Sequence, residues 1–393
     1  MDLNPSLKRY EHDLLHDTLP FWLTNGLDEE LGGVHTSLDR NGNLLDTDKA
    51  IWAQGRFAWM LATLYNTVER RQAWLDAALS CLGFLERHGF DHDGRMFFLV
   101  TTEGKPLRKR RYAYSEAFAS IAHAACAKAT GDPALGRKAL ELFEQFQRVA
   151  MEPGNAEPKI VPGTRDAKGI GPMMIGINVA QVLRETISFD GADALIDQWI
   201  DEIERDFCKP ELGAVMESVA LDGSIIDHFD GRLLNPGHAI EAAWFILKES
   251  HSRGGDPRLT SLGIQMLDWM WERGWDTRHG GLLSFVDVYD RPLQTIEHDM
   301  KYWWPHNEAC IATLFAASLT GERRHLERHQ LVHDWAHDHF VDPAGSEWFG
   351  YLHRDGTPST ELKGNHWKGP FHVPRMQWQC SQLLKHHLNS PGS

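Results

Sequence analysis

One feature of the sequence constrains the fold more than any other: a polar residue recurs near the start of successive apolar helical segments. The residues are Arg56, Glu116, Asn178, His238, Glu308 and His372. They are separated by 60, 62, 60, 70 and 64 positions. Hairpin-like stretches rich in Gly and Asp recur with a similar period, at 31–46, 89–104, 211–227, 280–293 and 345–357. Such self-similarity predicts one structural unit that is used several times.

The chain between these polar residues predicts pairs of helices, one inside and one outside a ring. Inner segments are expected at 48–68, 112–130, 173–186, from 235, at 299–319 and from 369. Outer amphipathic segments are expected at 6–24, 70–88, 134–150, 192–207, 258–273 and around 333–337. A single pair cannot bury its own apolar face, so the pairs must close on one another. We predict an all-α fold, an (α/α)6 barrel with short β-hairpins at one end, formed by residues 1–393 as one domain.

The composition excludes several classes of function. The formal net charge is -15 and the one basic run is 108–111, so a nucleic-acid partner is not expected. No segment approaches the roughly 20 apolar residues of a membrane span, and the N-terminus lacks an apolar signal core. The five cysteines are scattered, without a Cys-x-x-Cys pair, as is typical of reduced thiols. We therefore expect a cytoplasmic protein with no membrane partner, disulfide framework or metal motif.

The segment 301–309, Lys-Tyr-Trp-Trp-Pro-His-Asn-Glu-Ala, joins a strand-like hairpin to an apolar helix. At helical spacing Trp304, Glu308, Ile311 and Phe315 share one face. This face is polar near the start of the helix and apolar further along it. Such a helix is suited to forming the floor of a pocket. The chain has 15 tryptophans, several beside charged residues, and an indole face suits the C–H face of a sugar.

Two histidines begin inner segments in a similar way. His238 follows an Asn-Pro-Gly turn and has Glu241 one helical turn later, and His372 has Arg375 one turn later. Two imidazoles are suited to moving a proton near neutral pH, since their reference pKa is about 6.5. Convergent helix N-termini and the positive charge of Arg56 would stabilise an anion. The predicted chemistry is proton abstraction beside a carbonyl, through an enediolate.

Two other polar clusters allow more than one interpretation. His333 and His337 have the i, i+4 spacing of a zinc site, but no Glu follows the first His, and a polar surface face is favoured. The irregular stretch 152–171 carries Lys159, Arg165 and Lys168. Its glycines do not match the spacing of a phosphate-binding P-loop, which favours a lid or a connector.

The sequence resembles the N-acylglucosamine 2-epimerase family over nearly its whole length. The resemblance is carried by 32–33, 46–49 with 54–56, 299–309 and 368–375. The strings Trp-Trp-Pro-His-Asn-Glu and Phe-His-Val-Pro-Arg in these segments are specific rather than generic. The resemblance implies an (α/α)6 barrel, a homodimer, and interconversion of N-acetylglucosamine and N-acetylmannosamine by inversion at carbon 2. It implies no cofactor for the chemistry itself.

Carried over to this chain, the resemblance makes His238 and His372 the acid/base pair and places Arg56 and Glu308 in the same site. One histidine would remove the C2 proton of the open-chain sugar, and the other would return a proton to the opposite face. The sequence leaves open which histidine serves which face. The residues expected to bind the substrate or orient the imidazoles are Trp52, Tyr114, Asn178, Glu241, Trp303, Trp304 and Arg375.

The resemblance also bears on nucleotide and substrate choice. Family members acting on N-acetyl sugars are often activated by ATP without consuming it, which makes Lys159, Arg165 and Lys168 candidates for a nucleotide-binding loop. The related cellobiose 2-epimerases have further histidines just after the position of Asn178, where this chain has Val-Ala-Gln-Val. A disaccharide is therefore less favoured. Mannose 2-epimerases and mannose isomerases share the barrel and the histidine pair, so a free hexose is the alternative substrate.

Two alternatives belong to other classes of protein. An (α/α)6 glycosidase would need two carboxylates across the pocket, for which Glu116 and Glu308 are available. A mammalian family member resembles a renin-binding protein, which would be a non-catalytic role. A binding protein has no need of paired histidines, so the intact pair favours an enzyme.

Overall fold

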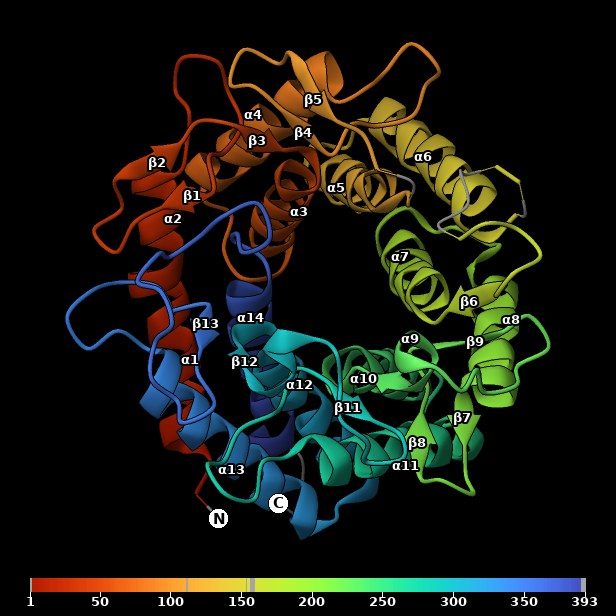
Figure 1. The fold of residues 1–393 in the computed structure, drawn as a ribbon. Helices are drawn as coiled ribbons and strands as arrows, with labels where there is room; N and C mark the ends of the chain where they lie inside the picture. Colours follow the sequence, from red (N-terminus) through yellow and green to blue (C-terminus); the bar gives the residue numbers. More distant parts are fainter. Residues whose placement is uncertain (1, 111, 153, 156–159, 390–393) are drawn as a thin grey trace.

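The computed structural model describes residues 2–110, 112–152, 154–155 and 160–389. Arg111 of the basic run and Lys159 of the candidate nucleotide loop lie outside these residues. Helices form a closed ring around a central axis, with the first helix and the last one side by side (Figure 1). The ring confirms the predicted (α/α)6 barrel.

The inner ring is built from helices that each pack against the next. Within the described residues these are α3 (Ile51–Thr67), α5 (Tyr114–Thr130), α7 (Gly171–Ile187), α10 (Pro236–Ser252), α12 (Trp303–Thr320) and α14 (His372–Asn389). The ring closes where α14 meets α3. Small residues allow the close approach: a Cβ on Gly55 of α3 would lie 2.8 Å from the backbone of Phe118 on α5. Inner helices are therefore buried on nearly every side.

The outer helices cover the ring and bury one face only. They are α1 (Asn4–Asp13), η1 (Leu14–Thr18), α2 (Leu19–Asn25), α4 (Gln72–His88), α6 (Pro133–Met151), α8 (Ala192–Glu202), η2 (Ile203–Phe207), α11 (Pro257–Gly274) and α13 (Arg323–Phe340). In α6 the buried residues Ala139, Leu142, Phe143, Phe146 and Val149 follow the spacing of an amphipathic helix. The α1 helix packs on α14, so the first segment acts as the outer partner of the last.

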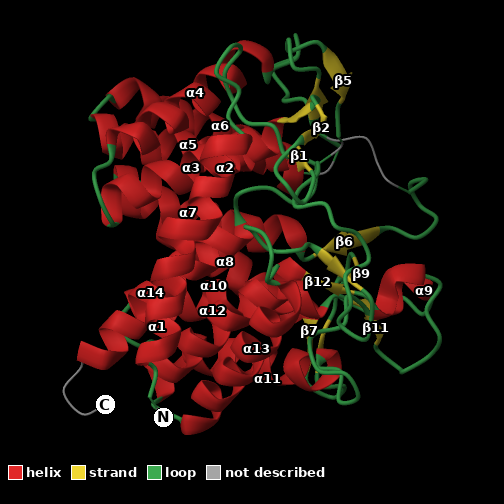
Figure 2. Ribbon diagram, turned by 90° about the vertical axis from the view of Figure 1, so that its left-hand side faces the viewer, coloured by secondary structure: helices red, strands yellow, loops and turns green. Residues whose placement is uncertain are grey.

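Short strands and long loops gather at one end of the barrel, where the inner helices begin (Figure 2). The strands are β1 (Ser37–Leu38), β2 (Leu44–Asp46), β3 (Lys49–Ala50), β4 (Leu99–Val100), β5 (Pro106–Arg108), β6 (Ala167–Gly169), β7 (Cys208–Lys209), β8 (Ala214–Val215), β9 (Ser218–Ala220), β10 (Leu233–Leu234), β11 (Val286–Asp287), β12 (Lys301–Tyr302) and β13 (Tyr351–Leu352). The sheets are antiparallel: β1–β2, β3–β4–β5, β6–β9, β7–β8, β10–β11 and β12–β13. Two short helices, α9 (Phe229–Arg232) and η3 (Ile296–Asp299), lie in the same loops.

The strand pairs connect neighbouring repeats rather than only closing local hairpins. The strands β3 and β12 immediately precede α3 and α12, and each pairs with a strand from the following repeat. A buried lysine begins each of them. Lys49 bonds Asp28 at 2.6 Å, and Lys301 bonds Asp276 at 3.2 Å. The repetition of this ion pair shows that the sequence repeat has a structural counterpart at the start of the inner helices.

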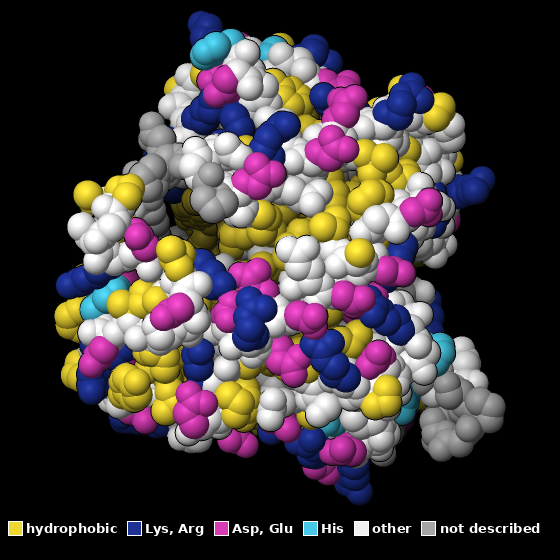
Figure 3. Space-filling model, turned by 90° about the vertical axis from the view of Figure 1, so that its right-hand side faces the viewer, with side chains coloured by type: hydrophobic (Ala, Val, Ile, Leu, Met, Phe, Trp, Pro, Cys, Tyr) yellow, Lys and Arg dark blue, Asp and Glu magenta, His cyan; other side chains and the backbone are white. Residues whose placement is uncertain are grey.

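The charged side chains and the thiols have the following arrangement. On the face drawn in Figure 3, Lys and Arg side chains are interspersed with Asp and Glu rather than gathered in one patch. The cysteines Cys81, Cys126, Cys208, Cys310 and Cys380 are all buried and free. Among the described helices, none is both long enough and apolar enough to cross a membrane.

Candidate active site

The first histidine of the site is held at the start of α10. Asn235 is the N-cap, and its side-chain oxygen accepts a hydrogen bond from the backbone N–H of His238 at 3.1 Å. Pro236 occupies the first turn, where its missing N–H costs nothing. The two carboxylate oxygens of Glu217 lie 3.0 and 3.1 Å from His238 Nδ1. The Asn235 side-chain amide nitrogen also lies 3.0 Å from His238 Nδ1. We assign the Nδ1 proton to the Glu217 contact, which leaves Nε2 for a substrate.

The second histidine begins α14 and is tied to a buried carboxylate. His372 Nδ1 lies 2.7 Å from Glu308 Oε1 on α12. Arg375 donates through Nη2 to the same oxygen and to Glu241 Oε1, both at 2.6 Å. The other Glu308 oxygen accepts a hydrogen bond from the Trp244 indole at 2.8 Å. This network links α10, α12 and α14, and it orients the His372 ring with Nε2 left for a substrate.

One indole lies against both imidazoles. The Trp304 ring is 5.0 Å from the His238 ring and 6.0 Å from the His372 ring, between centroids. Its position over α10 requires Gly237, because a Cβ there would lie 2.5 Å from the Trp304 ring. The two histidines, far apart in the sequence, therefore border one space.

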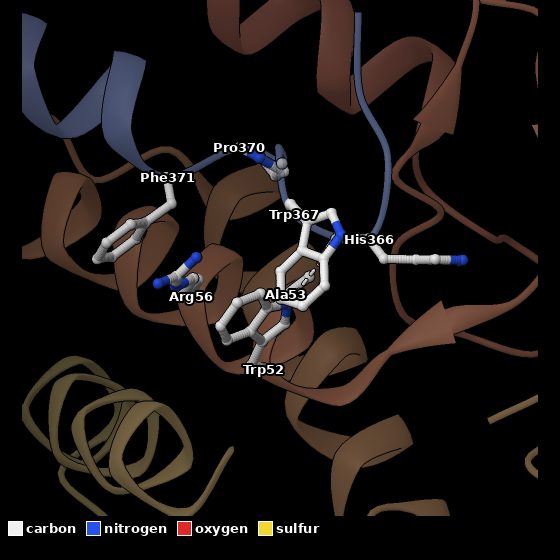
Figure 4. A pocket seen from close by; sticks show the side chains of 8 residues that line it. Trp52, Ala53, Arg56, His366, Trp367, Pro370 and Phe371 are labelled. Carbon is white, nitrogen blue, oxygen red and sulfur yellow. Dashed lines mark hydrogen bonds between the residues drawn. The ribbon is translucent and has the colours of Figure 1, made fainter. Parts of the chain in front are cut away.

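A guanidinium packed among aromatic rings lies in the same part of the barrel. Arg56 Cζ is 4.1 Å from the Phe118 ring centroid, 4.4 Å from Trp52 and 4.7 Å from Phe371. Figure 4 shows its side chain between Phe371 and Trp52, lining a small pocket with Trp367. No described residue hydrogen-bonds to Arg56 Nε. Burial lowers the pKa of Arg56 to about 9, so the group remains a cation at neutral pH.

The pKa values of the two imidazoles are shifted in opposite directions. Burial and the positive charges of Arg375 and Arg56 hold the pKa of His372 well below its ordinary 6.5, so this ring is neutral near pH 7. Burial also acts to lower the pKa of His238, but nearby carboxylates, Glu217 above all, outweigh it and raise that pKa. One ring is thus able to accept a proton while the other is able to donate one.

The carboxylates beneath His372 also have the spacing of a metal site. Ligand atoms of Glu241, Glu308 and His372 lie within 4.8 Å of one another. However, the Arg375 guanidinium is bonded to both carboxylates and already brings a positive charge to them. The cluster is therefore built to hold a guanidinium.

The remaining predicted substrate residues, Trp52, Trp303, Tyr114 and Asn178, lie on α3, α12, α5 and α7. Trp52 donates its indole N–H to the His366 carbonyl at 2.9 Å and so supports the loop before α14. Trp303 is only 3 % exposed. Tyr114 and Asn178 are half-buried at α5 and α7. Trp52 and Trp303 are accordingly fixed parts of the wall.

The candidate nucleotide loop lies apart from this cluster. Arg165 is exposed. Lys168, in β6, forms ion pairs with Glu202 at 2.7 Å and with Asp206 at 2.5 Å, on the outer elements α8 and η2. The ammonium group of Lys168 is thus already balanced by two carboxylates.

Glu116 has the repeat position of a site residue but a different environment. Its carboxylate is fully buried and accepts hydrogen bonds from Arg95 Nε at 2.7 Å and from the Met96 backbone N–H at 3.0 Å. Glu116 therefore fastens the preceding loop to α5. This arrangement removes Glu116 from the carboxylate pair, Glu116 and Glu308, that a glycosidase was expected to use.

The expectation of a polar surface face at His333 and His337 is wrong. Both side chains are buried, and the Tyr10 hydroxyl of α1 lies 2.8 Å from His333 Nδ1. Burial lowers the pKa of both histidines to about 3, so they are neutral. Neutral imidazoles pack between α13 and α1 as a core would, and the sequence pattern does not distinguish this from a solvated face.

Glu217 is the site residue that the sequence analysis missed. It lies between β8 and β9, in the hairpin-like stretch 211–227. Helical spacing can predict that Glu241 shares a face with His238, but it gives no direction to a side chain in a loop. The one signal in the sequence is a carboxylate within the hairpin that leads into the His238 helix.

The fold and the site together define a class of enzyme. A helical barrel brings an imidazole of lowered pKa, an imidazole of raised pKa and a guanidinium packed among aromatic rings to one end. These groups suit the transfer of a proton at a carbon beside a carbonyl, where an oxyanion must be stabilised.

Comparisons with known proteins agree with this class. The family described as N-acylglucosamine 2-epimerase (GlcNAc 2-epimerase) matches residues 32–373. The N-acylglucosamine 2-epimerase of Bos taurus is 34% identical over 382 residues, which cover 95% of this chain and 90% of the bovine protein. The chain therefore belongs to the N-acylglucosamine 2-epimerase family.

Solved structures share the fold at lower identity. The cellobiose 2-epimerase from Bacillus thermoamylovorans has a TM-score of 0.84 and 19% identity, covering 96% of this chain and 99% of that structure. A D-mannose isomerase has a TM-score of 0.81 and 16% identity, with coverages of 96% and 98%. These similarities confirm the barrel and do not select a substrate.

Proposed function

We propose that this protein is a sugar 2-epimerase that interconverts N-acetylglucosamine and N-acetylmannosamine. The observation that carries the proposal is the pair of imidazoles that border one space at Trp304 and have pKa values shifted in opposite directions. The choice of an N-acetyl sugar is supported by 34% identity to a bovine protein named for that activity. The reaction is an isomerisation and needs no cofactor for its chemistry.

In this proposal His372 is the base and His238 is the acid. The neutral His372 Nε2 removes the proton from C2 of the open-chain sugar, and the electron pair moves onto the C1 carbonyl oxygen. The protonated His238 then delivers its proton to the opposite face of C2, the C1–O double bond re-forms, and C2 is inverted. Each turnover leaves the proton on the other histidine, so the reverse reaction uses the same two groups with their roles exchanged.

Arg56 and the buried carboxylates serve the same step. The Arg56 guanidinium stabilises the enolate oxygen on C1, and the rings of Trp52, Phe118 and Phe371 hold the guanidinium in place. Glu308 holds the Nδ1 proton of His372, so that the lone pair on Nε2 faces the sugar. Glu241 and Arg375 fix Glu308 in turn and are positioning residues.

The sugar is proposed to lie against Trp304, whose indole reaches both imidazoles. Trp52 and Trp303 enclose it from the side, and Tyr114 and Asn178 offer polar groups to its hydroxyls. A C–H face of the sugar on the indole and hydroxyls toward polar groups is the arrangement that aromatic and amide side chains favour.

We further propose that ATP, as an activator that is not consumed, binds at the loop with Arg165, Lys168 and Lys159. Lys168 can contribute there only by exchanging a carboxylate partner, since Glu202 and Asp206 hold it in the free protein. The expected result is a higher melting temperature with ATP than with adenosine. The readout is thermal unfolding and does not depend on activity.

We also propose a cytoplasmic homodimer. The buried free thiols support a reducing compartment. Exposed apolar side chains on the hairpins, such as Leu45 at 59% and Leu107 at 50%, are surfaces that a second copy can cover. Light scattering of the purified chain measures the assembly, and a monomeric mass excludes the dimer.

The experiment is an incubation of the purified protein with N-acetylmannosamine, mannose and cellobiose in separate reactions, with and without ATP. We expect N-acetylglucosamine from the first sugar, and no product when His238 or His372 is replaced by Asn. Glucose from mannose would instead identify a hexose 2-epimerase, and fructose an aldose–ketose isomerase. Release of a reducing sugar from a polysaccharide with no epimer would contradict the proposal.

A further inference from the structure

The carboxylate that contacts the proposed acid comes from a loop, unlike the other charged groups of the site. The residues that hold His372 lie on inner helices α10, α12 and α14. By contrast, Glu217 lies between the short strands β8 and β9, and it reaches His238 Nδ1 with both carboxylate oxygens at 3.0 and 3.1 Å. The ring orientation of His238 therefore depends on where a loop is held.

The contact decides which nitrogen of His238 faces the sugar. With Nδ1–H donated to Glu217, Nε2 points to the space bordered by Trp304, whose ring centroid is 5.0 Å away. The titratable groups that face His238 are the carboxylates of Glu217, Glu241 and Glu308, and the neutral imidazole of His372 on α14. Of the carboxylates, Glu217 is the one bonded to the ring directly.

The backbone of Glu217 is fastened to a second segment that leads into α7. The Ile170 N–H donates to the Glu217 carbonyl at 3.1 Å. From there β6 and β9 pair in register, Gly169 with Ser218, Lys168 with Val219 and Ala167 with Ala220. Any shift of residues 167–170 is thus transmitted through backbone hydrogen bonds to Glu217.

The β6 strand is in turn anchored from outside the barrel. Lys168 is paired with Glu202 and Asp206, and Asp206 is only 5 % exposed. Before β6 the chain turns at 161–166, where the side chains are exposed. A continuous path of bonded groups therefore runs from an exposed loop to the ring of His238.

We propose that Glu217 is a positioning residue that orients the proton-donating histidine, and that the β6–β9 ladder makes the segment 160–169 the arm that sets its position. The proposal rests on the proposed epimerase function and adds to it a residue and a route of control. Binding of an anionic ligand to the exposed loop, or cleavage of the loop, therefore changes the orientation of His238 without any contact with the sugar.

The first test replaces the carboxylate by its isosteric amide, Glu217→Gln. We expect kcat to fall about 10- to 100-fold with little change in KM, as when the hydrogen-bond partner of a functional histidine is removed. The alkaline limb of the pH profile should move to lower pH, because His238 loses the charge that stabilises its protonated form, while the acid limb stays in place. Glu217→Asp, which keeps the charge, should restore the alkaline limb.

The matched control is Glu211→Gln, which removes the same charge from an exposed position of the same hairpin. It should leave kcat and both limbs unchanged. If Glu217→Gln lowers the rate without moving the alkaline limb, the residue is structural only, and the proposal is wrong.

The ladder is tested by Asp206→Asn, which breaks an anchor of β6 without touching the barrel centre. Measured without nucleotide, this variant should move the alkaline limb in the same direction as Glu217→Gln, by less. If the pH profile of Asp206→Asn matches that of the wild type, the segment 160–169 does not set the position of Glu217. Glu217 then acts on His238 only locally.

A substrate-free measurement separates this inference from the enzyme's activity. In protein labelled at histidine Cε1, the NMR signal that is lost in His238→Asn identifies His238 among the 22 histidines. Its titration should shift to lower pH in Glu217→Gln. If the wild type epimerises no sugar but this shift is seen, the proposed function fails and the Glu217 contact stands. If the titration does not shift, the contact itself is refuted.

Discussion

Replacement of Glu308 by Gln tests how the buried network supports the base. The carboxylate is 0 % exposed and accepts hydrogen bonds from His372 at 2.7 Å, Arg375 at 2.6 Å and Trp244 at 2.8 Å. The amide has nearly the same shape, but it lacks the charge and offers one acceptor oxygen instead of two. At least one donor of the three is then left without its partner.

The magnitude follows from these contacts. Removing one partner of a buried ion pair costs about 3–5 kcal/mol, and the upper end is not expected because Arg375 keeps Glu241 at 2.6 Å. A loss of about 3 kcal/mol is smaller than a typical free energy of unfolding of about 5–15 kcal/mol, so the variant should fold. The value of kcat should fall by about 10²–10⁴-fold, because His372 loses the acceptor that fixes its Nδ1 proton.

The assay is kcat for epimerisation together with the free energy of unfolding from denaturant titration. Glu249→Gln is the matched control, because Glu249 is also 0 % exposed and paired with Arg184 at 2.8 Å and Arg253 at 2.7 Å, in the last turns of α10. It should lose similar stability and keep its rate. If Glu308→Gln is destabilised like the control but retains kcat within about threefold, the network does not support the base and the reasoning is refuted.

Three further predictions follow from the same contacts. Activity should rise as pH increases through the lowered pKa of His372, because the base must be neutral, and fall as pH increases through the raised pKa of His238, because the acid must be protonated. A pH profile with a single limb would contradict the two-histidine assignment. Arg56→Lys keeps the charge but loses the planar group between aromatic rings, so kcat should fall about 10²–10³-fold with the fold unchanged by circular dichroism; an active variant would show that charge alone suffices. Lys301→Met leaves Asp276 buried with less compensation and should reduce the free energy of unfolding by about 3–5 kcal/mol, whereas an exposed replacement, Lys105→Met, should not.

The barrel and the centre of the site were predictable because the repeat fixes where the inner helices begin. His238, Glu308 and His372 lie in the first two turns of α10, α12 and α14, and closure of the ring brings the starts of the inner helices to one end. The helix face then predicts which neighbours accompany them, as Glu241 does with His238 and Arg375 with His372.

The repeat does not predict the partner that each polar residue finds. Glu116 has the right position but bonds Arg95, which lies in the loop before it. Glu217 has no repeat position, and it reaches His238 because β9 pairs with β6. Such contacts depend on loop conformation and long-range strand pairing, which helical periodicity does not encode.

Histidine itself limits what a pattern can predict. His333 and His337 look polar in the sequence, but burial makes them neutral and they pack against Tyr10. Carboxylates, Glu217 above all, raise the pKa of His238, the proposed acid, whereas burial and the charges of Arg375 and Arg56 lower the pKa of His372, the proposed base. The environment decides the role, and the environment comes from tertiary structure.

The most direct test of the two-histidine mechanism is the fate of the C2 proton in deuterated water at low conversion of N-acetylmannosamine. Because one histidine takes the substrate proton and the other supplies a solvent-derived one, the product should carry deuterium at C2 from the first turnovers, while the remaining substrate carries none. A product that keeps the original C2 proton would mean that a single group moves the proton between the two faces, and would contradict the account.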